Sequence, residues 1–152
     1  MKGWLAWAAA GVVAAAGASG CGGGQDPPPT ACSDGARTVL GALQRAPGDV
    51  SLEGGTLIST CVRRSLDTGQ IQTLGFTYLA AANNELQLMP HSDAAALQLG
   101  FLVGAVRRGA NKTNGVQLEL VRRLDQVAGV GGPPGPRRAA YRRGMAAGED
   151  HG

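Results

Sequence analysis

The chain has 152 residues, of which 43% are hydrophobic and 16% are charged, with 14 Lys or Arg against 11 Asp or Glu. This length suits one small domain with flanking segments. The formal net charge of only +3 argues against a nucleic-acid-binding protein, because such proteins usually carry a basic stripe interleaved with aromatic residues.

The first residues have the pattern of an export signal. Lys2 supplies a positive charge, and the stretch from Trp4 to Ala16 carries no charge at all. This stretch is shorter than the about 20 apolar residues that a membrane-spanning helix needs. Small residues follow it and lead directly to Cys21. An ordinary secretory cleavage after Ala18 and an uncleaved anchor are the alternatives.

The sequence Ala18-Ser19-Gly20-Cys21 resembles the lipobox of bacterial lipoproteins, although Ala18 stands where that motif usually has Leu. The resemblance covers residues 1–21 and implies nothing about the fold of the rest. It implies a signal peptide over 1–20 and lipidation of Cys21, which becomes the mature N-terminus. Two or more acyl chains, such as palmitate, hold a protein stably at a membrane. The expected location is the extracytoplasmic face of the cell membrane, or the outer membrane of a Gram-negative cell.

Cys32 and Cys61 remain as a pair once Cys21 is assigned to lipid. An even pair in an exported, oxidising compartment predicts a disulfide. Such a bond would close a loop of about 30 residues and stabilise the domain by roughly 3.5 kcal/mol. Two buried free thiols are the alternative, and a metal site lacks a third ligand.

Residues 21–31 are rich in Gly and Pro and are expected to form a flexible tether. A helical domain is expected over 32–130, and its first helix follows Ser33 as N-cap and ends before Pro47. The periodicity from Leu57 to Leu66 predicts a second helix, although its β-forming residues leave a strand open.

Three more helices are expected in this domain. The third carries apolar residues from Ile71 to Leu86, with Thr68 as a candidate cap, and the fourth covers 94–108 after a cap at Ser92 or Asp93. The fifth begins after Asn114, with Gln117 completing a capping box, and Glu119 and Arg123 form a supporting pair. In the fourth helix, small residues recur every four positions, which is typical of a buried helix that another helix approaches closely; they are Ala96, Gly100 and Gly104.

Residues 131–152 begin with Gly and Pro and continue with arginines, which predicts a disordered tail. The fold class is therefore all-α, with four to five helices pinned by one disulfide between two flexible ends. Four arginines are candidates for contact with an anionic lipid surface or cell-wall polymer, unless they are simply solvated; they are Arg137, Arg138, Arg142 and Arg143.

The sequence offers little catalytic chemistry. His91-Ser92-Asp93 contains the residue types of a triad, but neighbours in sequence rarely reach triad geometry, and the spacing fits a helix start. No phosphate-binding loop, paired acids or metal-ligand set is present, so no cofactor is expected.

These features predict a non-enzymatic interaction or accessory protein that is lipid-anchored in the bacterial envelope. Its partners are expected to be the membrane and an envelope protein or anionic envelope polymer, and not nucleic acid. The alternative is a lipoprotein that binds a small apolar ligand between its helices, using the apolar segment 94–106.

Overall fold

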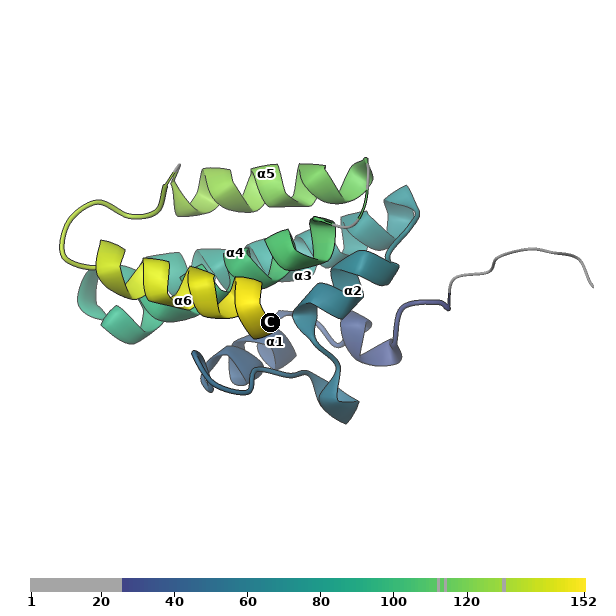
Figure 1. The fold of residues 1–152 in the computed structure, drawn as a ribbon, viewed down its shortest axis with the longest axis horizontal. Coiled ribbons are helices and arrows are strands. Elements are labelled where there is room, and N and C mark those ends of the chain that lie inside the picture. Colours follow the sequence, from purple (N-terminus) through teal and green to yellow (C-terminus); the bar gives the residue numbers. More distant parts are fainter. Residues whose placement is uncertain (1–25, 112, 114, 130) are drawn as a thin grey trace, which may run out of the picture.

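The computed structural model describes residues 26–111, 113, 115–129 and 131–152. This part of the chain is all-helical, as predicted, and contains six α-helices and three short 3-10 helices (Figure 1). The α-helices are α1 (Ala36–Leu43), α2 (Ile58–Arg64), α3 (Thr68–Leu88), α4 (Asp93–Ala110), α5 (Val116–Ala128) and α6 (Arg138–His151). The 3-10 helices are η1 (Thr30–Ser33), η2 (Glu53–Gly55) and η3 (Met89–His91).

Several predictions concern residues outside the described ranges. They are the signal peptide over 1–20, lipidation of Cys21, the first part of the tether and the cap at Asn114. The tether was predicted to extend to residue 31, but η1 already includes Thr30 and Ala31, and Ala31 is buried. The folded domain therefore begins two residues earlier than predicted.

Local sequence explains where the helices begin. The hydroxyl of Ser92 accepts a hydrogen bond from the Ala95 amide (3.1 Å) at the start of α4, as predicted. Asp67, rather than Thr68, caps α3 by accepting from the Gln70 amide (2.8 Å). The cap predicted for α1 at Ser33 is wrong, because Ser33 belongs to η1 and Gly35 is the N-cap residue.

Helix α4 lies at the centre of the domain and contacts each of the other five α-helices (Figure 1). Its apolar residues from Leu99 to Val106 are all buried, which confirms the prediction of a central buried helix. Residues 99–106 are consequently core, whereas Ala94 is exposed and Leu97 and Gln98 are half-buried. Leu43, Ile58, Tyr78 and Leu124 bring the other helices into the same core.

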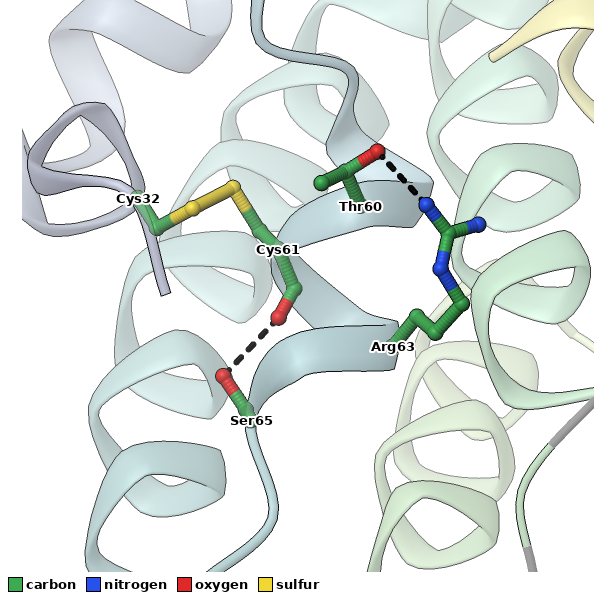
Figure 2. Close-up of a disulfide and its surroundings, with 5 residues drawn as sticks. All are labelled: Cys32, Thr60, Cys61, Arg63 and Ser65. Carbon is green, nitrogen blue, oxygen red and sulfur yellow. Dashed lines mark hydrogen bonds between the residues drawn. A yellow bond between two sulfur atoms is a disulfide. The ribbon is translucent and has the colours of Figure 1, made fainter. Parts of the chain in front are cut away.

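The disulfide between Cys32 and Cys61 forms as predicted, with 5.5 Å between the two Cα atoms. It joins η1 to the middle of α2 (Figure 2). Residues 58–64 are helical, which settles the choice between helix and strand in favour of a helix. After α2, the Ser65 hydroxyl donates to the Cys61 carbonyl (2.9 Å), and Gln117 of α5 donates to the Ser65 carbonyl (2.7 Å).

The prediction of a disordered tail over 131–152 is wrong. Residues 138–151 form α6, which packs along α4 and buries Ala140 and Tyr141 (Figure 1). The domain consequently contains six α-helices instead of four or five and continues to Gly152. Sequence patterns miss α6 because half of its buried positions are glycines, which do not register as apolar residues.

Glycines on both helices allow α4 and α6 to meet backbone to backbone. A Cβ atom on Gly100 would overlap the carbonyl oxygen of Tyr141, and one on Gly104 would overlap that of Met145. The reverse holds on α6, where a Cβ atom on Gly144 would overlap the Leu97 carbonyl oxygen. Since no larger residue fits here, the four-residue spacing of small residues specifies this helix pair.

Candidate functional site

The four arginines that the sequence suggested for contact with an anionic surface lie in the first half of α6 and at the residue before it. Arg137 lies 3.6 Å from the Asp93 carboxylate at the start of α4, and Arg138 donates to the Pro133 carbonyl (3.3 Å). Arg142 and Arg143 are exposed, and within the described part of the chain neither forms an ion pair. We name Arg138, Arg142 and Arg143 the α6 arginine face.

The face lies away from the side of α6 that packs on α4. Residues Ala140, Tyr141, Gly144 and Gly148 make the buried side of the helix. At 3.6 residues per turn, Arg138 and Arg142 follow one another along the opposite side, with Arg143 next to them. The guanidinium groups of Arg142 and Arg143 are therefore available to solvent without disturbing the helix pair, while Arg138 is exposed but also donates to the Pro133 carbonyl.

The other basic pairs are used inside the domain. Arg107 of α4 lies 2.7 Å from Asp125 of α5 and 3.7 Å from Glu149 of α6. Arg108 donates to the carbonyl oxygens of Glu149 and Asp150, which end α6. These two arginines thus fasten the last turn of α6, whose carbonyls lack partners within the helix.

Arg63 and Arg64 also have partners within the chain. Arg63 donates to the Thr60 hydroxyl (3.1 Å; Figure 2), and Arg64 lies 3.8 Å from Asp26, where the described chain begins. On α5, Arg122 and Arg123 both pair with Glu119, at 2.6 Å and 2.9 Å. The supporting pair that was predicted between Glu119 and Arg123 is confirmed.

A shallow groove of ≈ 330 Å³ runs between the first halves of α3 and α5. Ile71, Gly75, Val116 and Leu120 line it with apolar surface, and polar residues stand around them. Gly75 contributes no side chain, and a Cβ atom there would lie 3.9 Å from Leu120. The volume is at the lower end of that of small-molecule sites.

Phe76 is a large exposed apolar residue on the same helix as the groove. It follows Gly75 directly on α3, and 70% of its surface is exposed. Exposed phenylalanines stand out because aromatic side chains usually bury most of their area. Phe76 does not line the groove itself, whose α3 residues are Thr68, Ile71, Gln72 and Gly75.

Among the residues that the structure describes, three ionisable side chains with a raised pKa are buried. Burial raises the pKa of Tyr141 to about 12 and raises the pKa of Tyr78 further still above its ordinary value. Burial also raises the pKa of Glu85, which is 3% exposed and whose Oε2 atom has no hydrogen-bond partner. Tyr78 and Glu85 lie seven residues apart on α3, and both are buried in the packed interior of the domain.

The residues that resembled a triad have structural roles. Ser92 caps α4, Asp93 pairs with Arg137, and His91 is exposed in η3. The capping interpretation is therefore confirmed. Within the described ranges, no group of three or more His, Cys, Asp or Glu side chains is arranged to hold a metal ion.

Sequence reasoning missed the groove and the position of α6. The pairing of α6 with α4 did leave a signal, since Gly144 and Gly148 repeat the spacing of Gly100 and Gly104. No helix among the described residues is both long and apolar enough to cross a membrane. Comparison of the chain with models of protein families, with curated proteins and with solved structures found no match.

Proposed function

We propose that this chain is an exported bacterial lipoprotein, anchored through lipid on Cys21, whose helical domain acts as a non-enzymatic interaction module in the cell envelope. The observation that carries the proposal is the Cys32–Cys61 disulfide. Structural disulfides form and persist in exported proteins and are rare in the reducing cytosol. The lipobox-like sequence before Cys21 supplies the anchor that the proposal requires.

The position of the disulfide fits a tethered domain. Cys32 lies in η1, the first folded element after the chain enters the domain at Asp26, and Cys61 is fully buried in α2. A force on an N-terminal anchor would therefore be transmitted through the Cys32–Cys61 bond to the buried part of α2. Without it, η1 would be held by few buried groups and would be the first element to detach.

Metabolic labelling with a radioactive fatty acid tests the proposal. The full chain should incorporate the label and sediment with membranes, whereas Cys21→Ser should do neither. Cys32→Ser is the matched control, since it also removes one thiol but should keep the label. A full chain that carries no label, or label that survives Cys21→Ser, would refute lipidation at this residue.

The groove between α3 and α5 favours a second candidate function, the binding of a small apolar ligand. Its floor is apolar, and Gly75 keeps it open. Native mass spectrometry of the protein should then show a bound apolar compound. Gly75→Leu, which would fill the groove, should abolish that binding, whereas Gly41→Leu on the exposed side of α1 should retain it.

A further inference from the structure

We propose that the α6 arginine face binds a phosphate-bearing polymer of the cell envelope; this rests on the proposed function, which places the domain outside the cytoplasm. Three arginines stand on the solvent side of one helix, and Arg142 and Arg143 have no carboxylate to neutralise them within the described residues. The arginine fork matches the geometry of phosphate oxygens and forms paired, charge-assisted hydrogen bonds with them.

A structural role does not account for this face. Cations stabilise the last turn of a helix and are unfavourable in its first turn, where the helix dipole is positive. Arg138 nevertheless occupies the first turn of α6, and the acids Glu149 and Asp150 occupy its end. The helix dipole therefore does not explain the position of Arg138, whereas Glu149 has a partner inside the domain in Arg107.

Comparison with the other arginine pairs supports this interpretation. Arg107 and Arg108 bind groups of α5 and α6, and Arg122 and Arg123 share Glu119. Each of these pairs is therefore committed to a partner inside the chain. Arg142 and Arg143 are the adjacent arginines that the described structure leaves free to bind a ligand.

The helix that carries the face is held rigidly. Gly144 and Gly148 place α6 against the backbone of α4, and Arg108 holds its last carbonyls. A polymer would therefore meet arginines whose backbone is already ordered, which lowers the entropic cost of binding.

The direction of the face favours a polymer over the bilayer that holds the anchor. The purple start of the described chain and the start of α6 lie at opposite ends of the view in Figure 1. Asp26 is five residues after Cys21 in the chain, a separation that spans at most about 17 Å. Helix α4 has 18 residues and is therefore about 27 Å long, which is more than the reach of the tether. The start of α6 lies beside the first residue of α4, because Arg137 contacts Asp93. The face thus lies at the end of the domain far from the tether, where an anchored domain can present it away from its own membrane.

The test compares two pairs of adjacent, exposed arginines. R142Q/R143Q changes the face, and R122Q/R123Q is the matched control, since both remove two positive charges from helix surfaces. Both are made in the full chain with Cys21→Ser, so that acyl chains cannot insert into vesicles. The probes are fluorescent long-chain inorganic polyphosphate and vesicles of phosphatidylglycerol with phosphatidylcholine.

R142Q/R143Q should weaken polyphosphate binding roughly 30-fold, or about fivefold per arginine, and flatten its dependence on salt. The control should change binding less than about twofold, because Glu119 pairs with both of these arginines and offsets part of their charge. Equal losses in the two variants, or no binding of polyphosphate, would overturn the proposal. Vesicle binding that is tighter than polyphosphate binding and depends on Arg142 and Arg143 would also overturn it, in favour of a membrane contact.

This outcome is independent of the anchor. Polyphosphate binding is measured without lipid on the protein, so its failure removes the polymer and leaves lipidation to the labelling experiment. A failure of labelling with intact polyphosphate binding would remove the anchor and keep the face.

Discussion

Gly100→Ala is expected to destabilise the domain by detaching α6. The added Cβ atom would overlap the carbonyl oxygen of Tyr141, which belongs to the backbone of α6 and cannot rotate away like a side chain. Overpacking of a core typically costs 1–3 kcal/mol, and a rigid obstacle places this substitution near the upper value, at about 3 kcal/mol. Alanine is better than glycine inside a helix by about 1 kcal/mol, which leaves a net loss of about 2 kcal/mol.

Gly41→Ala provides the control for this estimate. Gly41 also lies inside a helix, α1, but a Cβ atom there meets nothing within 4 Å. This variant should therefore gain the full helix preference, about 1 kcal/mol. The preference cancels in the comparison, so the two variants should differ by about 3 kcal/mol, the cost of the overlap itself.

Urea unfolding followed by circular dichroism measures both stabilities, and hydrogen exchange locates the change. In Gly100→Ala, the amides of α6 should lose protection, whereas those of α3 and α5 should keep most of theirs. The reasoning would be refuted if Gly100→Ala were as stable as Gly41→Ala, or if α6 stayed as protected as before.

Three further predictions follow from the buried groups. Replacing Cys32 and Cys61 by Ala should lower the free energy of unfolding by about 3.5 kcal/mol through the loop of 29 residues, and urea titration would contradict this if the midpoint did not move. Tyr78 and Tyr141 are the only tyrosines of the chain, and burial raises the pKa of both, so absorbance at the tyrosinate band should not rise near pH 10. Because the unfolded chain loses these protons at a lower pH than the folded state, the free energy of unfolding should fall above pH 10. Burial raises the pKa of Glu85, so the ionised carboxylate destabilises the folded state above the ordinary glutamate pKa. Glu85→Gln should therefore raise the free energy of unfolding at pH 7 but not below that pKa. Equal effects at pH 4 and pH 7 would contradict the burial of this carboxyl group.

Elements with an apolar stripe could be predicted from the sequence. The spacing of the apolar residues predicted α1, α3, α4 and α5, because the buried residues of one helix face recur every 3.6 residues. The pairing of Cys32 with Cys61 followed from their number and the expected compartment. Caps were less secure: Ser92 was correct, but Asp67 and Gly35 took the places expected of Thr68 and Ser33.

Helix α6 could not be predicted from hydrophobic periodicity, because its packing is made by absent side chains. Gly144 and Gly148 bring two backbones together, and only Ala140 and Tyr141 bury side chains on the same side. The partner glycines lie some forty residues earlier on α4, so the signal is visible only when both segments are considered together. The same separation hid the groove between α3 and α5, whose walls come from two helices distant in sequence.

The α6 arginine face shows what sequence and structure each contribute. The sequence identified four basic residues around Tyr141 but assigned them to a disordered tail. The structure places them on a fixed helix and separates Arg137, which pairs with Asp93, from Arg142 and Arg143, which stay exposed. The basic residues that the sequence assigned to a disordered tail therefore form a defined surface on α6.

The most direct test of the account is the intact mass of the protein extracted from native membranes, measured before and after reduction. The protein should begin at Cys21 and carry two or three acyl chains, and it should gain two hydrogens when the Cys32–Cys61 bond is reduced. A chain that begins at Ser19 without lipid would contradict the anchor and identify a secreted protein with a free thiol at Cys21.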